Sequence, residues 1–280
     1  MKTRHARPRT LPSLPLTTLA LALCLASWAA PGVGDEAHAQ QPAAPAAALP
    51  QQQKAAPGSP SFTVQEFYRL MRERRFREAF ALSIFAPALE GLSAEEYEDL
   101  RPDFERQAVE VPERVALTGE QLSGDDATVF MKLGTDEAPQ VVPVFLIREP
   151  GVWIVGDRDN QKLVKKRGKK FFFEARIEAH HDDVENMLKR ISTAQVIYSA
   201  QNGGRFGDLN QLVRAGLVPQ DILSTESTGY RFHVETAPGG KSYTGGAEPA
   251  RYGRTGRLSF YLDPSGLKKD DKGGKPLKGT

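Results

Sequence analysis

The chain carries helical hydrophobic spacing in two regions, and strand-like alternation follows in each. In the first region, apolar residues recur every three to four positions from Phe62 to Leu82. This spacing predicts a helical segment with one buried face. Ser93 followed by Glu96 is a capping box, which predicts a further helix running toward Phe104. Helices therefore open the first patterned region.

The pattern then changes to a period of two. Gly124-Asp125 predicts a turn between the first two strands, and Glu149-Pro150-Gly151 predicts a turn between the last two. Helices followed by antiparallel strands indicate an α+β layer. The predicted strands are residues 109–117, 128–133, 141–147 and 152–155.

The second region repeats this order. An apolar stripe predicts one long helix over residues 171–201, and Gly203-Gly204 ends it because glycine accepts the left-handed conformation found after helices. A short helix is expected between Phe206 and Gly216, and Asp263-Pro264-Ser265-Gly266 fits a type I turn. The predicted fold class is α+β in two domains. The expected strands of the second domain are residues 230–235, 241–245 and 257–262.

The first domain, including its late hairpin Phe145-Leu146-Ile147-Arg148-Glu149-Pro150-Gly151-Val152-Trp153-Ile154-Val155-Gly156-Asp157, resembles the nuclear-transport-factor-like superfamily. The resemblance implies a curved antiparallel sheet wrapped around helices into a cone with an apolar cavity. Enzymes of that superfamily place acids, His or Tyr in the cavity, whereas residues 61–160 contain no histidine. None of the available groups stands out as the buried carboxylate that such catalysis requires. These groups are Tyr68, Tyr97, Asp103, Glu120, Asp126 and Asp136.

The second domain resembles the globular head of bacterial type IV pilins and pseudopilins over about residues 171–267. The ordered series that carries the resemblance is Ile191-Ser192-Thr193-Ala194-Gln195-Val196-Ile197-Tyr198, Asn202-Gly203-Gly204, Leu209-Asn210-Gln211-Leu212, Ser227-Thr228-Gly229-Tyr230-Arg231-Phe232 and Tyr252-Gly253-Arg254-Thr255-Gly256-Arg257-Leu258-Ser259-Phe260-Tyr261-Leu262-Asp263-Pro264-Ser265-Gly266. It implies a long helix packed on a small antiparallel sheet. Pilins also have a hydrophobic half-helix that enters the membrane and the filament core, and a basic segment stands here in its place. Filament formation is therefore not expected.

The N-terminus has the three parts of a secretory signal peptide. A basic start precedes an apolar core at Leu16–Leu25, and Ala37-His38-Ala39 predicts cleavage after Ala39. A membrane anchor and a lipoprotein attached through Cys24 are the alternatives, but the apolar run is short for a span and Leu21 stands where a lipoprotein signal needs a small residue. The expected location is periplasmic or secreted.

Composition completes the expected domain map. Residues 40–60 are rich in Gln, Ala and Pro and predict a disordered linker, and residues 268–280 predict a disordered tail of Lys, Asp and Gly. The domains are therefore 61–160 and 171–267, with a basic linker at 161–170. The chain has 37 Lys and Arg against 35 Asp and Glu, a net charge of +2, which excludes a nucleic-acid footprint. Cleavage after Ala39 would leave a cysteine-free chain that is formally neutral.

The basic linker suggests one candidate contact. Its charges could meet an anionic membrane surface, although a solvated linker or the exposed start of a helix fits the same pattern. No matching basic stripe occurs elsewhere in the chain. The residues are Lys162, Lys165, Lys166, Arg167, Lys169 and Lys170.

Other polar residues suggest chemistry without completing a site. His180-His181-Asp182-Asp183, with Glu185 one turn on, offers two metal ligands at helical spacing, fewer than zinc needs, so a polar helix face is the expected reading. His233 is expected to be exposed on a strand. Ser192 and Thr193 have no His or Asp partner at a recognisable spacing. No catalytic, cofactor-binding or metal-binding residue is predicted.

Two functions remain as hypotheses. The first is an exported, non-enzymatic adaptor or scaffold of the bacterial cell envelope, with the pilin-like head making contacts to envelope proteins or to pilus or secretion proteins. The alternative is a protein that binds a small apolar ligand, or acts as an isomerase or cyclase, through the cavity of the first domain. A pocket lined by Phe67, Met131 and Trp153 together with a buried acid would favour the alternative.

Overall fold

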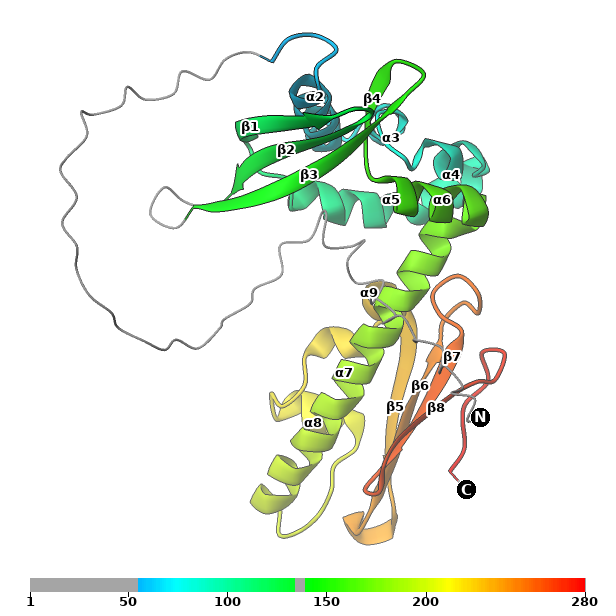
Figure 1. Ribbon diagram of the computed structural model, residues 1–280. Helices are drawn as coiled ribbons and strands as arrows, with labels where there is room; N and C mark the ends of the chain where they lie inside the picture. The colour runs from blue at the N-terminus through cyan, green and yellow to red at the C-terminus, as the bar shows by residue number, and fades with distance from the viewer. Residues whose placement is uncertain (1–54, 134–138, 280) are drawn as a thin grey trace, which may run out of the picture. The chain divides into compact units, whose positions relative to one another are not determined.

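The computed structural model describes residues 55–133 and 139–279, and the chain divides into two compact units, Met1–Lys169 and Lys170–Thr280. Both units combine helices with a four-stranded antiparallel sheet, which confirms the α+β fold class (Figure 1). The predicted signal peptide with its cleavage site, most of the 40–60 linker, and Asp136 lie outside the described residues. Within the described ranges, no helix combines the length and apolar character that a membrane span needs.

In unit 1, the predicted helical segment from Phe62 to Leu82 is two helices. The chain turns at Arg74, whose φ of 57° lies in the left-handed region and cannot continue a right-handed helix. The Ser59 side chain caps the first helix by accepting a hydrogen bond from Phe62 N–H. The predicted capping box of Ser93 and Glu96 is confirmed. The helices before the sheet are α2 (Pro60–Arg72), α3 (Phe76–Ala81), α4 (Ala86–Glu90) and α5 (Ala94–Val109).

The sheet of unit 1 is a meander in the order β1-β2-β3-β4. Helix α2 lies across one face of it (Figure 1), and its residues Phe67 and Met71 are buried. The predicted turns at Gly124 and Gly151 connect neighbouring strands, and both glycines have positive φ. The strands are β1 (Ala116–Ser123), β2 (Asp126–Leu133), β3 (Gln140–Glu149) and β4 (Val152–Val155).

The prediction of the first strand at residues 109–117 is wrong for most of its length. Val109 ends α5 and is 74% exposed, and β1 begins only at Ala116. β1 lies at the edge of the sheet and most of its residues are exposed, so it lacks the alternation that marks a half-buried strand. Apolar residues in a helix end and a connection produced a misleading period of two.

The predicted basic linker is a helix, α6 (Arg158–Arg167). The Asp157 side chain caps it by accepting hydrogen bonds from Asp159 and Asn160 N–H, and Gly168 ends it with a φ of 52°. Val164 is fully buried, so this helix is anchored to unit 1 despite its charge. Basic side chains in its last turn suit the negative end of the helix dipole.

Unit 2 begins with α7 (Phe171–Gln201), which has the predicted bounds of the long helix. Its sheet is again a meander, in the order β5-β6-β7-β8, and α7 lies along one face (Figure 1). The remaining elements are α8 (Leu209–Arg214), η2 (Gln220–Leu223), α9 (Thr225–Thr228), β5 (Tyr230–Thr236), η3 (Pro238–Gly240), β6 (Tyr243–Pro249), β7 (Leu258–Asp263) and β8 (Gly266–Asp271); the short η1 (Gly168–Lys170) precedes α7.

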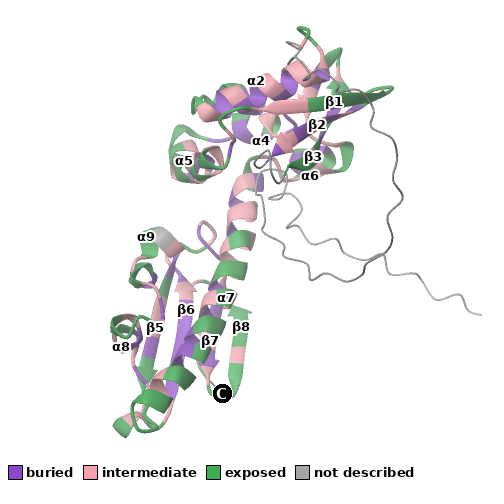
Figure 2. Cartoon of the chain, turned by 90° about the vertical axis from the view of Figure 1, so that its left-hand side faces the viewer, coloured by how far each residue is buried: buried purple, intermediate pink, exposed green. Residues whose placement is uncertain are grey.

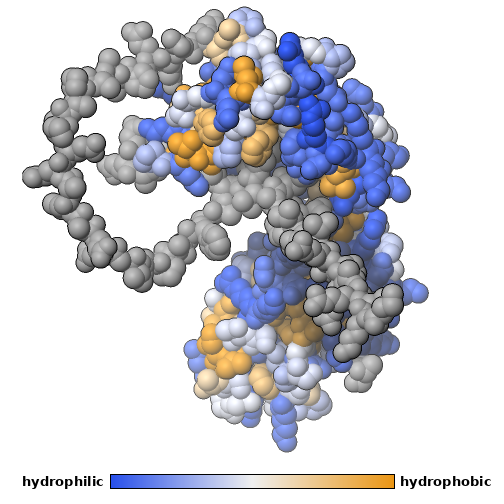
Figure 3. Space-filling view, viewed as in Figure 1, coloured by the Kyte–Doolittle hydropathy of each residue, from blue (hydrophilic) through white to orange (hydrophobic). Residues whose placement is uncertain are grey.

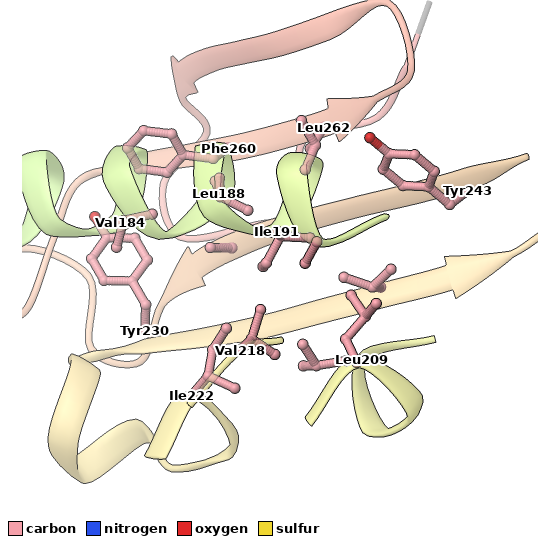
Figure 4. Packing of buried hydrophobic residues seen from close by; sticks show 14 residues of the cluster. Val184, Leu188, Ile191, Leu209, Val218, Ile222, Tyr230, Tyr243, Phe260 and Leu262 are labelled. Atoms are coloured by element: carbon pink, nitrogen blue, oxygen red, sulfur yellow. The ribbon is translucent and has the colours of Figure 1, made fainter. Parts of the chain in front are cut away.

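The core of unit 2 lies between α7 and the sheet. Figure 4 shows Leu188 and Ile191 of α7 pointing toward the strands, with Phe260 and Leu262 approaching from β7. Leu209 of α8 packs into the same cluster. Buried residues accordingly concentrate along β5, β6 and β7 in Figure 2. The apolar stripe predicted for the long helix is its buried face.

The prediction of a disordered tail at residues 268–280 is wrong over its first part, since β8 pairs with β7 through Asp271. The turn after Asp263 sets the register, with Asp263 opposite Gly266. Tyr252 also donates its hydroxyl to the Asp271 carboxylate at 3.0 Å. Composition failed to reveal this strand because an edge strand is held by backbone hydrogen bonds and does not need apolar side chains.

Candidate functional site in the second unit

The sheet of unit 2 has two different faces. One packs on α7, and the other is formed by the alternate positions of the four strands. The strand register places His233 beside Gly246, Gly246 beside Tyr261, and Tyr261 beside Lys268, so polar residues form rows across this second face. The residues of the face are Arg231, His233, Glu235, Thr244, Gly246, Glu248, Ser259, Tyr261, Lys268 and Asp270.

Glu248 lies between two cationic partners on this face. Its Oε1 is 3.6 Å from Nε of Arg231, and its Oε2 is 3.4 Å from Nδ1 of His233. The Glu248 side chain is only 13% exposed. Its carboxylate raises the pKa of His233 by favouring the charged imidazolium. At 3.4 Å the histidine contact is long for a hydrogen bond, so Oε2 keeps the capacity to accept one.

A buried hydroxyl lies on the neighbouring strand β7. Extending the β6–β7 register by one residue places Ser259 beside Glu248. Ser259 is fully buried, and its Oγ has no hydrogen-bond partner among the described residues. Buried polar atoms are normally satisfied, so an acceptor and a hydroxyl together in this state mark a polar site.

The C-terminal segment of the chain, residues 272–279, returns over the same face. Gly273 and Gly274 have φ values of 62° and 81°, which lets the chain reverse direction after β8. Gly279 lies so close to Tyr261 that a Cβ there would collide with the tyrosine hydroxyl. A groove of about 750 Å³ runs between this segment and the sheet. It is lined by His233, Glu235, Thr244, Gly245, Glu248, Tyr261, Pro276, Leu277, Lys278 and Gly279.

The lining of the groove is suited to binding a ligand that donates hydrogen bonds. Two carboxylates, Glu235 and Glu248, and the hydroxyls of Thr244 and Tyr261 offer hydrogen-bond acceptors along its length. An extended peptide segment or another ligand rich in N–H or O–H donors matches this lining. Among the described residues, no group of three or more His, Cys, Asp or Glu is placed to hold a metal ion.

The His180-His181 pair has a role that the sequence did not predict. His180 Nδ1 lies 2.8 Å from the carbonyl oxygen of Thr255, and His181 Nε2 accepts hydrogen bonds from the N–H groups of Arg257 at 3.1 Å and Leu258 at 3.2 Å. Both histidines therefore bind backbone of the β6–β7 connection. Both are partly exposed, as expected for a polar patch on a partly exposed helix, and the contact with residues far along the chain is the feature that was not foreseen.

Glu185 and the hydroxyl groups of Ser192 and Thr193 also have local partners. Glu185 forms ion pairs with Lys269 at 2.6 Å and Lys189 at 3.1 Å. Tyr243 donates its hydroxyl to Ser192 Oγ at 3.5 Å, and Thr193 Oγ1 donates to the carbonyl of Lys189. These hydroxyl and carboxylate groups lie in separate local contacts and do not assemble into one site.

His233 differs from its prediction as an exposed strand residue. Its side chain is 40% exposed and paired with Glu248. Glu248 and Ser259, which complete the polar site, were not singled out from the sequence. In the sequence, Arg231, His233 and Glu235 alternate with apolar residues. This alternation predicts a polar sheet face, but it does not predict which segment covers that face.

In unit 1, several of the suspected polar groups have local partners. Tyr68 is buried, which raises its pKa to about 12. Glu120 accepts hydrogen bonds from Ser61, at 3.1 Å from its N–H and 2.6 Å from its hydroxyl. Asp126 pairs with Arg158 at 2.9 Å.

Two further candidates of unit 1 also contact basic side chains. Asp103 pairs with Arg106. Arg77 stacks over the Tyr97 ring at 4.1 Å, and burial raises the Tyr97 pKa. These groups are therefore held in separate local contacts rather than gathered at one site.

The basic residues around α6 are partly neutralised within unit 1. Lys162 pairs with Asp159 at 2.9 Å, Lys165 with Glu149 at 3.2 Å, and Lys169 with Glu96 at 3.7 Å. Lys166 and Lys170 are exposed, and Arg167 is half-buried. The segment thus presents less net charge than its sequence suggests.

Comparison with known proteins gives no match to a family model, to a curated protein or to a solved structure.

Proposed function

We propose that this protein is an exported, non-enzymatic adaptor or scaffold of the bacterial cell envelope, whose pilin-like unit 2 binds a partner protein of the pilus or secretion type. Export follows from the signal-peptide pattern that ends at Ala39. The resemblance of unit 2 to pilin heads suggests the class of partner. The proposal does not include filament formation, because a basic segment stands in front of α7.

The groove on the second face of the unit 2 sheet is the observation that carries this proposal. It combines a largely buried carboxylate, Glu248, with a second carboxylate, Glu235, and with residues 276–279 of the chain itself as its other wall. A groove that runs between the sheet and residues 276–279 has the shape for an extended segment of a partner. Its acceptor-rich lining favours a segment that brings N–H donors or a Lys or Arg side chain.

The alternative function, ligand binding or catalysis in unit 1, has less support. The three side chains proposed to line a cavity, Phe67, Met131 and Trp153, are all buried. The buried polar residues in the described part of unit 1 are Thr63, Ser83 and Gln161, and none is an acid. A raised-pKa carboxylate, which the suggested chemistry needs, is thus missing from that set.

Among the described elements of unit 1, the helix contacts with the sheet come mainly from α2, which lies across one face, and apolar side chains are exposed elsewhere on the sheet. Val141 and Phe145 of β3 are each more than half exposed, and Figure 3 shows apolar residues gathered over strands β1 to β3. Exposed apolar surface of this kind is a second candidate for protein contacts and fits a scaffold better than an enzyme.

Site-specific photo-crosslinking in cells of the producing bacterium tests the proposal. The crosslinker replaces Thr244, which is exposed and lines the groove, and a matched control carries it at the exposed Asn210 of α8. We expect an envelope, pilus or secretion protein to crosslink at position 244 and not at 210. Glu248→Gln should lower the yield of that adduct, because the neutral amide of Gln cannot replace the negative charge of the carboxylate.

Equal labelling at the two positions, adducts only with cytoplasmic proteins, or the absence of any adduct at 244 would contradict the proposal. Turnover of a small-molecule substrate by the purified chain would contradict its non-enzymatic part.

A further inference from the structure

The connection between β6 and β7, residues 250–257, is held onto α7 by the two neighbouring histidines. His180 Nδ1 must carry the hydrogen in its contact with Thr255, because a carbonyl oxygen can only accept. His181 Nε2 meets two backbone N–H groups and must therefore be the unprotonated nitrogen of a neutral ring. The two rings hold the same loop with opposite hydrogen-bonding roles.

This difference makes one contact sensitive to acid and the other insensitive. A proton added to His181 would lie on Nε2, between the N–H groups of Arg257 and Leu258, and would replace two hydrogen bonds with repulsion between donors. His180 keeps its Nδ1–H donor in either charge state, so its bond to Thr255 survives protonation.

The surroundings of His181 oppose its protonated form. The rings of Tyr230 and Phe260 lie at steep angles to its ring, with centroids 6.4 and 6.2 Å away. Burial is the largest influence and lowers the His181 pKa, with Lys269 of β8 acting in the same direction.

Four charged or titratable groups face the ring. Lys269 of β8, Arg257 just before β7 and His180 of α7 disfavour its charge, and Asp182 of α7 favours it. Lys269 is itself paired with Glu185.

The loop covers the end of the unit 2 core. Gly256 lies against Tyr230, where a Cβ would collide with the phenol, and Tyr230 donates its hydroxyl to the carbonyl of Leu258 at 3.1 Å. Tyr230 is fully buried beneath this loop. Loosening the loop would therefore uncover a buried aromatic residue, Tyr230.

We propose that residues 250–258 form an acid-released cover over Tyr230, with His181 as the group that releases it. The cover is closed while His181 is neutral, and protonation of Nε2 breaks its two bonds to the β7 backbone. This regulatory role is independent of what the groove on the opposite face binds.

The sign of the effect follows from linkage. The pKa of His181 in the folded chain lies below the unfolded value near 6.5. The stability that its two hydrogen bonds contribute is therefore complete above about pH 6.5 and is lost as the pH falls toward the folded pKa. Opening of the loop should become more favourable by about tenfold for each unit by which the pKa is lowered.

Hydrogen exchange of the full chain, measured amide by amide between pH 7.5 and 5 and corrected for intrinsic rates, tests the proposal. We expect the protection of Arg257 and Leu258 to fall with pH while amides in the core of α7 stay protected. His181→Gln, whose side-chain oxygen can accept the same bonds without titrating, should abolish the response. The matched variant His180→Gln should retain it.

Constant protection of Arg257 and Leu258 down to pH 5, or an unchanged response in His181→Gln, would overturn the proposal. If that variant does not fold, the wild-type NMR titration decides. The proposal requires loss of protection at these two amides to share its midpoint with the His181 ring. A midpoint that differs from the ring titration contradicts it.

Discussion

The two units are built from the same parts, helices and a four-stranded antiparallel meander, yet they use polar side chains differently. In unit 1, groups such as Asp126 and Glu120 pair at or near the surface with single local partners. In unit 2, polar side chains reach below the surface and bind the backbone of distant segments, as Gln195 does with Gly207 and His181 with Leu258. Both units have apolar cores, and in unit 2 fully buried polar side chains such as Gln195 also hold loops in place.

The largest effect is expected from the core of unit 2. Leu188 is fully buried between α7 and the sheet, so Leu188→Ala should cost about 2–5 kcal/mol in the free energy of unfolding. After residue 39, Trp153 of unit 1 is the only tryptophan. In a preparation of residues 40–280, the fluorescence of Trp153 reports the unfolding of unit 1, whereas circular dichroism reports the unfolding of both units. In Leu188→Ala we expect the dichroism transition to move to lower urea concentration. The fluorescence transition should keep its wild-type midpoint.

Val196→Ala is the matched control on the same helix, because Val196 is 67% exposed and its truncation should change little. Equal shifts of the fluorescence and dichroism transitions in Leu188→Ala would mean that the two units unfold as one, against their division into separate compact bodies.

A smaller loss is expected for a buried polar contact. Gln195 is fully buried, donates to the Gly207 carbonyl at 2.6 Å and accepts from the Gly207 N–H at 3.0 Å. Gln195→Ala leaves both backbone groups without partners and should cost about 2 kcal/mol. The exposed Gln201→Ala is its control, measured in the same urea titration. Similar stabilities for the two variants would refute the importance of buried polar contacts in unit 2.

The sequence predicted elements well where one side of an element is buried. The helix at Phe171–Gln201 was predicted to the residue, since its stripe faces a continuous core. β1 was misplaced and β8 was missed because edge strands are held by backbone bonds that leave no apolar pattern. The break at Arg74 was also missed, because helical spacing continues on both sides of it.

The candidate site was less predictable than the fold. The groove needs His233, Glu248 and the C-terminal segment to meet, and their meeting depends on strand register and on a chain reversal at Gly273. The metal-like spacing at His181 was visible in the sequence, but its partner is backbone, which has no sequence signature.

A modest pH effect should distinguish the two faces of the unit 2 sheet. Glu248 raises the pKa of His233, so the pair stabilises the fold below the unfolded histidine pKa near 6.5 and loses this contribution as the pH rises through the folded value. The stability contribution of His181, on the other face, depends on pH in the opposite direction, because it is lost as the pH falls. Because His233 is 40% exposed, His233→Gln should cost less than about 1 kcal/mol at pH 5.5 and still less at pH 8.5.

Thermal unfolding of His233→Gln and the wild type at the two pH values measures this difference. Glu248→Gln should remove the same pH-dependent component. A larger loss at pH 8.5 than at pH 5.5 would show that the pair does not hold a charged His233.

The smallest effect tests the surface pairs of unit 1. Lys165 lies 3.2 Å from Glu149, whose pKa is lowered by its hydrogen bond with Gln161 and then by Lys165. A double-mutant cycle of Lys165→Ala and Glu149→Ala should give a coupling of about 0.3 kcal/mol in low salt, because exposed pairs are screened by solvent. Molar salt should remove it. A coupling above about 1 kcal/mol that survives salt would place a desolvated charge on α6, and the contrast between surface pairing in unit 1 and buried polar contacts in unit 2 would then fail.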